Sequence, residues 1–285
     1  MSESLRYKAD ESRQSVFAEM QAHFHASSMG RSLPRVSMAD HRLDTALGGG
    51  LLCKRVHLVT SGAYASLASG FSLAVVAMML KAQKMSGPIV WCGPWRSGQS
   101  GQLFGAGLAE IGLRPEQFIF IRESHPLRRM AACEEALATA GLGAVIHEYG
   151  PLYEKSDLWQ KTARRLQLAC ERGSATAFMI GAAGAASGFE SAWDISPVSP
   201  DTRYHNSIAS HDWRAMWQCS LRHVRGGYPA QANLIWDRHK AHFVTMNSCA
   251  GDVPQSARSA RSAWHDQPYR MDKPALSGFD LQKSA

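Results

Sequence analysis

One stretch near the start of the chain has the layout of a phosphate-binding site. The glycine-rich segment LDTALGGGL (Leu43–Leu51) precedes a strand-like RVHLVT, and the small-residue loop SGAYASLASG then leads into a helical pattern. A strand, a glycine-bearing turn and a helix N-terminus, in that order, can direct backbone N–H groups at a phosphate. A working loop of this kind reads GxxxxGK[ST], where the lysine contacts the β- and γ-phosphates and the hydroxyl contacts Mg²⁺.

The lysine of such a loop is missing from this stretch. Counted from Thr60, the lysine position falls on Ser66 and the hydroxyl position on Leu67, and the first glycine of the loop is Gly62. The charge of a triphosphate would then rest on backbone N–H groups and a helix dipole, which contributes about 0.3–1 kcal/mol at an exposed site. We therefore expect no nucleotide cofactor and no catalytic residue here, and we interpret the stretch as a degenerate nucleotide site.

The carboxylates that assist a nucleotide site are only partly present. The strand-like GAVIHE ends in Glu148, where a metal-holding carboxylate would stand, but acidic residues at strand ends are common in unrelated proteins. The strand-like PIVWC, after which a catalytic glutamate would follow, continues as GPWRSGQS. No acid is therefore in place to orient a water, and Glu148 is the fifth member of the degenerate site.

Alternating strand and helix patterns surround this site and predict an α/β fold. Five short apolar segments (RVHLVT, PIVWC, QFIFI, GAVIHE and ATAFMI) are separated by helical patterns. This alternation is typical of a parallel sheet that is covered by helices on both faces. After GAAGAASG, four segments (SAWDIS, AMWQCSLRHV, ANLIW and HFVTM) follow without long helices, so we predict that they extend the sheet edge as antiparallel strands.

The two ends of the chain differ in composition from this core. Residues 1–35 carry one helical pattern and a Ser/Gly/Pro break, which predict a helical arm and a linker. Residues 250–285 are rich in Ser, Ala, Arg and Pro with little periodicity, which predicts a disordered basic tail. The core domain is expected over residues 36–249.

The composition excludes several classes of protein. The longest apolar run is far shorter than the ~20 residues that span a bilayer, so we expect a cytoplasmic protein without membrane contact. The six cysteines form no CxxC pair, which favours reduced thiols over disulfides or zinc. His239 and His242 lie in a strand-like stretch and should point to opposite faces, so we expect no metal site.

Basic side chains provide the candidates for binding. The formal charge of +7 favours attraction to polyanions, although it also serves solubility. Trp95 and Arg96 follow the end of a predicted strand, where parallel sheets place ligands, and are the first candidates for a surface contact. Arg164 and Arg165 flank a buried helical stripe, and we favour a solvated helix face over a partner contact for this pair.

Further basic residues concentrate late in the chain. Arg222 and Arg225 stand just before a Gly-Gly turn, and the tail adds Arg258 and Arg261. These four residues are candidates for contact with DNA or a partner protein. Tryptophans of the same region (Trp213, Trp217 and Trp236) could stack on single-stranded DNA, but tryptophan at strand spacing more often belongs to the core.

The order of these segments resembles the core of RecA, and more closely the ImuA family of RecA-like, SulA-like proteins of bacterial induced mutagenesis. Three stretches carry the resemblance: AGLAEIGLRPEQFIFIRE (106–123), ARRLQLACERG (163–173), and SLRHVRGG with ANLIWD (220–227 and 232–237). The resemblance covers about residues 36–247 and leaves both termini unexplained.

The resemblance implies a non-catalytic adaptor in translesion DNA synthesis during the SOS response to DNA damage. Its implied partners are a Y-family polymerase homologue (ImuB-like), an error-prone C-family polymerase, and RecA or single-stranded DNA, with association to the nucleoid during damage. Two other functions stay open. One is an ATP-dependent, RecA-like DNA-binding ATPase; the other is a cell-division inhibitor of the SulA type, for which the basic hairpin and tail would be superfluous.

Overall fold

The computed structural model of this 285-residue chain describes residues 33–62, 65–94, 103–149, 156–198 and 215–245. The chain divides into two units, 1–246 and 247–285, and every described residue belongs to the first. The predicted arm and tail therefore lie outside the described residues, except that Arg35 already forms part of a strand. None of the described helices is both long and apolar enough to cross a lipid bilayer.

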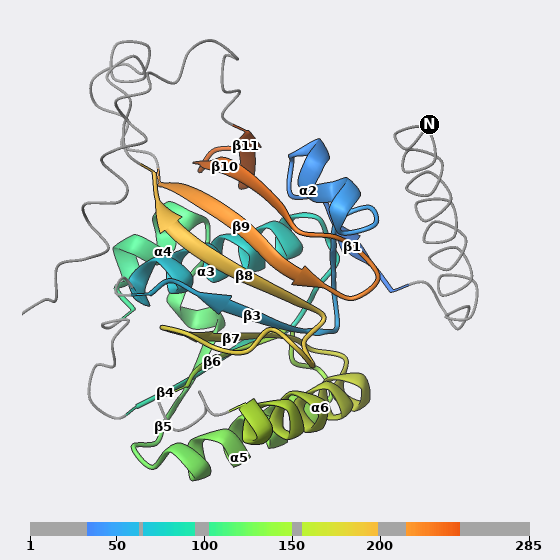
Figure 1. Ribbon diagram of the computed structural model, residues 1–285. Coiled ribbons are helices and arrows are strands. Elements are labelled where there is room, and N and C mark those ends of the chain that lie inside the picture. Colours follow the sequence, from blue (N-terminus) through green and yellow to red (C-terminus); the bar gives the residue numbers. More distant parts are fainter. Residues whose placement is uncertain (1–32, 63–64, 95–102, 150–155, 199–214, 246–285) are drawn as a thin grey trace, which may run out of the picture. The chain divides into compact units, whose positions relative to one another are not determined.

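A nine-stranded sheet forms the centre of the described part (Figure 1). The strand order is β11-β10-β9-β8-β3-β7-β6-β4-β5. The six strands from β8 to β5 pair in parallel, and β9, β10 and β11 add to them antiparallel. The bounds are β3 (Val56–Thr60), β4 (Ile89–Gly93), β5 (Phe118–Arg122), β6 (Ala144–Glu148), β7 (Thr176–Gly181), β8 (Ser191–Pro197), β9 (Met216–Val224), β10 (Ala230–Asp237) and β11 (His242–Thr245).

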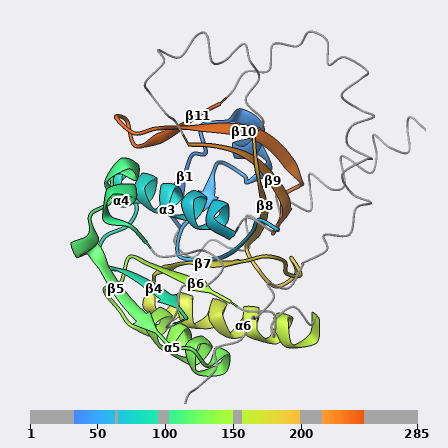
Figure 2. The same cartoon turned by 90° about the vertical axis from the view of Figure 1, so that its left-hand side faces the viewer.

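Helices cover both faces of the parallel part, as the alternating pattern predicted (Figure 2). On one face lie α3 (Ala65–Lys81) and α4 (Gly105–Ile111), and on the other lie α5 (Pro126–Ala138) and α6 (Ser156–Gly173). A single 3₁₀ turn, η1 (Pro115–Gln117), connects α4 to β5. The predicted fold class, α/β with a mostly parallel sheet and antiparallel C-terminal strands, is confirmed.

The prediction for the segment SAWDIS was wrong in one respect. This segment forms β8, which is parallel to β3 and not antiparallel to its sheet neighbour on that side. Strands β7 and β8 flank β3, so residues 182–190 carry the chain across it. A crossover between parallel strands usually contains a helix and a dozen or more residues, and the lack of a helical pattern in this short connection led to the wrong orientation.

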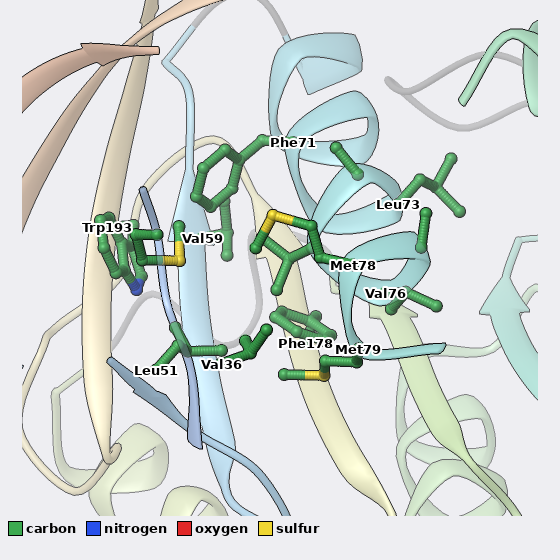
Figure 3. Packing of buried hydrophobic residues seen from close by; sticks show 14 of the residues in the cluster. Val36, Leu51, Val59, Phe71, Leu73, Val76, Met78, Met79, Phe178 and Trp193 are labelled. Atoms are coloured by element: carbon green, nitrogen blue, oxygen red, sulfur yellow. The ribbon is translucent and has the colours of Figure 1, made fainter. Parts of the chain in front are cut away.

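The α3 face holds the larger apolar core. Most side chains of α3 are buried, because the sheet, α4 and β11 all pack against it. Phe71 of α3 lies near Val59 and Trp193 (Figure 3), with 5.6 Å between the ring centroids of Phe71 and Trp193. Phe71 also stacks on Phe243 of β11 at 5.7 Å. This apolar contact joins the parallel strands to the antiparallel ones.

The glycine-rich segment LDTALGGGL supports the fold and does not approach the phosphate position. Its first four residues end α2 (His41–Ala46), and its last residue begins β2 (Leu51–Leu52), which pairs with β1 (Arg35–Val36). Gly50 has φ +115°, and a Cβ there would lie 2.5 Å from the Val36 carbonyl oxygen. The Arg35 guanidinium donates to the carbonyls of Leu47 and Gly50 at 2.6 and 3.0 Å. Only glycine fits this close backbone approach.

Candidate functional site at the carboxyl edge of the sheet

The carboxyl ends of the parallel strands meet at one edge of the sheet, where α/β proteins place ligands. Thr60 ends β3 and pairs with Gly181 of β7, while Glu148 of β6 pairs with Ile180 on the other side of β7. Two strand spacings of roughly 4.8 Å therefore place the backbone of Glu148 about 10 Å from that of β3. The predicted members of the degenerate site lie along this edge.

The loop after β3 does not offer its first N–H groups to a ligand. The Ser61 N–H donates to the Gly181 carbonyl at 3.3 Å, and the Gly62 N–H donates to the Ala182 carbonyl at 3.1 Å. The chain thus follows β7 beyond the end of β3, with Gly62 at φ +53°. In the first turn of α3, Ser66 is exposed, and Leu67 packs partly against the core. A serine and a leucine supply no positive charge at this end of the helix.

Glu148 is part of the buried structure at this edge. Its carboxylate accepts a hydrogen bond from Trp91 Nε1 at 3.2 Å, and only 7% of the residue is exposed. Its backbone carbonyl accepts from Arg129 Nε at 3.0 Å. A Cβ at Gly93 would lie 3.7 Å from the carboxyl carbon of Glu148, so β4 approaches this side chain closely. The carboxylate thus has a structural partner and is in van der Waals reach of β4.

Thr60 faces away from the α3 side and joins a polar group that sequence reasoning did not assemble. Its hydroxyl lies 2.9 Å from the Trp193 carbonyl and 3.2 Å from Asp194 Oδ1, with the carbonyl and the carboxylate as acceptors. Arg222 Nη2 donates to Thr60 Oγ1 at 3.1 Å. Asp194 belongs to β8 and Arg222 to β9, so one predicted arginine reaches the end of β3 within the same chain.

Arg225, the second arginine of the hairpin, contacts the opposite end of the sheet. Its Nε lies 4.0 Å from Glu190 Oε2, which is also 3.8 Å from Arg55 Nε. Burial raises the pKa of Glu190, while Arg225 and Arg55 act to lower it. Arg222 and Arg225 therefore contact different groups and do not form one compact cluster. A Cβ at Gly227 would lie 2.1 Å from the Ala46 carbonyl oxygen, so this glycine lets the hairpin pack on α2.

The two arginines of α6 are exposed, whereas the helical stripe beside them is buried at Thr162, Leu166 and Cys170. Arg165 pairs with Glu134 of α5, with Nε 3.3 Å from Oε1, and so joins the two helices on this face. Arg164 remains on the surface. Both interpretations, a solvated helix face and a partner contact, fit this exposure.

The tryptophans of the antiparallel strands belong to the core. Trp217 and Trp236 are each 3% exposed, and both pack edge-to-face on Phe243. Neither can stack on a base in this arrangement, so the core alternative holds for both. Trp213, Trp95, Arg96, Arg258 and Arg261 lie outside the described residues.

An apolar edge that sequence reasoning did not select lies at β5, the outermost parallel strand. Ile119 and Phe120 of β5 are 47% and 43% exposed, and two further apolar residues, Phe104 just before α4 and Leu127 at the start of α5, are more exposed still. An edge strand presents backbone N–H and C=O groups on its outer side and is usually protected by charge. The sequence FIFI, with no polar alternation, was the available signal.

Fold and site together define an α/β protein with a mostly parallel sheet whose phosphate-loop position carries no lysine. No family model matches the chain. Among curated proteins it is similar to Protein ImuA of Caulobacter vibrioides, in strain NA1000 / CB15N and in strain ATCC 19089 / CIP 103742 / CB 15. Each of these is 27% identical over 211 residues, which cover 69% of this chain and 81% of the relative.

Proposed function

We propose that this chain is a non-catalytic accessory protein in DNA-damage-induced mutagenesis and translesion synthesis. The similarity to Protein ImuA supports the process, and the state of the phosphate position supports the lack of catalysis. The observation that carries the proposal is the pairing of the Ser61 and Gly62 N–H groups with carbonyls at the end of β7. These two N–H groups are therefore not available to a phosphate, and Ser66 and Leu67 supply no positive charge in their place.

The partner surface in this proposal is the apolar β5 edge, which we define as Phe104, Ile119, Phe120 and Leu127. Exposed apolar side chains at an unpaired edge strand favour contacts with other proteins. An extended segment of a partner can add to an edge strand through backbone hydrogen bonds. The occupant we propose is a segment of the Y-family polymerase homologue, so that the chain bridges it to the error-prone C-family polymerase. Arg222 would then serve DNA or a second partner.

Thermal denaturation with ATP and Mg²⁺ tests the non-catalytic part. A ligand at 100 times its Kd raises the free energy of unfolding by about 2.7 kcal/mol, which a melting experiment detects readily. We expect no shift in melting temperature at millimolar ATP. A shift that Glu148→Gln abolishes, accompanied by hydrolysis, would replace this proposal with the ATPase alternative.

Co-purification with the candidate partners tests the adaptor part. We expect Phe120→Asp to abolish capture of the co-expressed polymerase homologue. Leu168→Asp on α6 is the matched control, because Leu168 has the same 43% exposure on a different surface. Capture that survives Phe120→Asp would refute the β5 edge as the surface. Capture of a tubulin-like division protein in place of the polymerase would favour the SulA-type alternative.

A salt titration of single-stranded DNA binding tests the role of the arginines. Each phosphate contact that is lost should reduce the slope of log K against log salt by about one. We expect Arg222→Gln with Arg225→Gln to flatten the slope if these residues contact DNA, and Arg164→Gln to leave it unchanged or lower it less. An unchanged slope for the double variant would remove DNA from the proposed role of this hairpin.

A further inference from the structure

A buried group of metal-ligating side chains lies on the α5/α6 face of the sheet, next to the Glu148 position of the carboxyl edge. Cys92 of β4, Cys133 of α5 and His147 of β6 each direct one donor atom to a common point, and these atoms all lie within 4.8 Å of one another. All three residues are 0% exposed. The group draws on three separate elements, so only the folded chain assembles it.

His147 distinguishes this group from ordinary buried cysteines. Neither ring nitrogen of His147 has a hydrogen-bond partner among the described residues. Burying a polar group without a partner is costly, and native proteins seldom retain such a group without a functional reason. Buried cysteines alone behave as small apolar residues, but a histidine that faces two thiols without any other partner has the chemistry of a third ligand.

We propose that Cys92, Cys133 and His147 bind one thiophilic d¹⁰ metal ion, Zn²⁺ or Cu⁺. With metal–sulfur bonds of about 2.3 Å and metal–nitrogen bonds of about 2.0 Å, the donor atoms of such a site lie about 3.5–4 Å apart. The present separations therefore need only a small contraction around an ion. The ion would accept the lone pair of one His147 nitrogen and hold both sulfurs as thiolates.

The charges of the site fit both ions. Two thiolates and a neutral imidazole make a Zn²⁺ complex neutral, which suits an apolar interior. With Cu⁺ the complex carries one negative charge, and the Arg129 guanidinium lies close enough to depress the pKa of His147 and would offset that charge. Soft thiolate ligands select these ions over Mg²⁺ or Ca²⁺. Three ligands suffice for Cu⁺, whereas Zn²⁺ would add a fourth ligand.

Burial determines how the ion enters. The thiols must lose their protons to act as ligands, and hydrogen bonding to Cys92 together with burial raises the pKa of Cys133 well above its usual value. Binding of Zn²⁺ therefore releases two protons as two thiols become thiolates. Because no ligand is exposed, we expect the ion to enter during folding or local opening, and slowly when it is added to the folded protein.

The test is metal loading of the full chain during refolding. The denatured protein is refolded with one equivalent of Zn²⁺, or of Cu⁺ under anaerobic reducing conditions, desalted, and analysed by native mass spectrometry and elemental analysis. We expect one ion per chain, and at least tenfold weaker retention against a chelator for Cys92→Ala, Cys133→Ala and His147→Leu. Cys219→Ala is the matched control, because Cys219 is a buried thiol in the α3-face core.

X-ray absorption at the metal edge of the loaded wild-type protein keeps the proposal testable if a variant fails to fold. We expect two sulfur ligands and one imidazole nitrogen, with one additional light ligand for Zn²⁺. Retention of Zn²⁺ alone or of Cu⁺ alone identifies the ion and supports the site. Absence of either ion, a different ligand set, retention in all three variants, or a Cys92–Cys133 disulfide in the isolated protein would overturn it.

Discussion

Each face of the parallel sheet buries a histidine, and the two histidines differ in their hydrogen bonds. His57 of β3 lies on the α3 face, with Nδ1 2.7 Å from Ser191 Oγ and Nε2 2.9 Å from the Leu52 carbonyl. His147 of β6 lies on the α5/α6 face, and no described residue bonds either of its nitrogens. The first histidine links β3 to its neighbour β8 and to β2 through hydrogen bonds, so the fold explains its burial. The second destabilises the folded state, because its buried nitrogens have no hydrogen bond to offset their loss of water. This points to a ligand.

Acidification should produce the largest change in the free energy of unfolding, and the buried histidines of both faces contribute to it. Burial lowers the pKa of His57 to about 4 and that of His147 to about 3, while the unfolded value is near 6.5. Below pH 6.5 these two histidines therefore bind protons in the unfolded chain but stay neutral in the folded chain. The folded state is fully stabilised above that pH, and the free energy of unfolding falls as pH falls. From pH 7 to pH 5 we expect the free energy of unfolding to fall by roughly 4 kcal/mol for the two groups together.

Urea denaturation of metal-free protein across this pH range measures the effect. In His147→Leu the contribution of one histidine is removed, so the fall in the free energy of unfolding from pH 7 to pH 5 should be about 2 kcal/mol smaller than in the wild type. Other titrating groups are common to both proteins and cancel in the difference. Identical slopes for the two proteins would mean that the pKa of His147 is the same in the folded and the unfolded chain.

The second largest expected effect is that of His57→Leu at neutral pH. This substitution leaves the Leu52 carbonyl without its donor and removes one partner of the Ser191 hydroxyl, inside the protein. We expect the free energy of unfolding to fall by about 3 kcal/mol, because each unsatisfied buried group costs about 1–3 kcal/mol. Chemical denaturation gives the value. A change below 1 kcal/mol would show that the His57 bonds contribute little and would weaken the contrast between the faces.

Most of the fold could be predicted, because the strands and helices carry their own periodic signals. The apolar segments GAVIHE and ATAFMI became β6 and β7 with boundaries shifted by one residue at most. The orientation of β8 could not be predicted, because it depends on where a short connection crosses the sheet. Likewise, nothing local in the sequence indicated that Gly50 allows a close backbone contact with β1.

The candidate site could be predicted only where its chemistry is local. The missing lysine is a property of one loop, whereas the contact from Arg222 to Thr60 joins two strands that are distant in sequence. The Cys92, Cys133 and His147 group escaped the search for metal motifs for the same reason, since its ligands come from three elements. His239 and His242 were expected in one strand-like stretch. In the structure His239 lies in the turn after β10, and His242 begins β11.

A smaller effect is expected for Glu148→Leu, which extends the comparison to a partnered carboxylate. Trp91 Nε1 donates to Glu148, so removal of the carboxylate leaves a buried N–H without this acceptor. We expect a loss of about 2 kcal/mol in the free energy of unfolding. Glu148→Gln keeps an acceptor oxygen and should lose less than half as much, as measured by urea denaturation. Equal losses for both variants would mean that the negative charge, and not the hydrogen bond, stabilises this position.

The smallest expected effect is that of His147→Leu on the metal-free protein at neutral pH. Leucine has a similar volume and introduces no polar atom, so it removes two unsatisfied nitrogens from an apolar site without leaving a large cavity. Replacing an unsatisfied buried polar group by an apolar one of similar shape is nearly neutral or stabilising, so we expect a change between zero and a gain of about 1 kcal/mol. Chemical denaturation after chelator treatment measures it beside His57→Leu, whose effect has the opposite sign.

The same two variants are then measured after refolding with the ion. The ion should stabilise His57→Leu as much as it stabilises the wild type. It should not stabilise His147→Leu, which becomes less stable than the wild type by the free energy of metal binding. A loss of several kcal/mol from His147→Leu without any metal would mean that His147 has partners of its own in the fold, and the contrast between the two faces would then disappear.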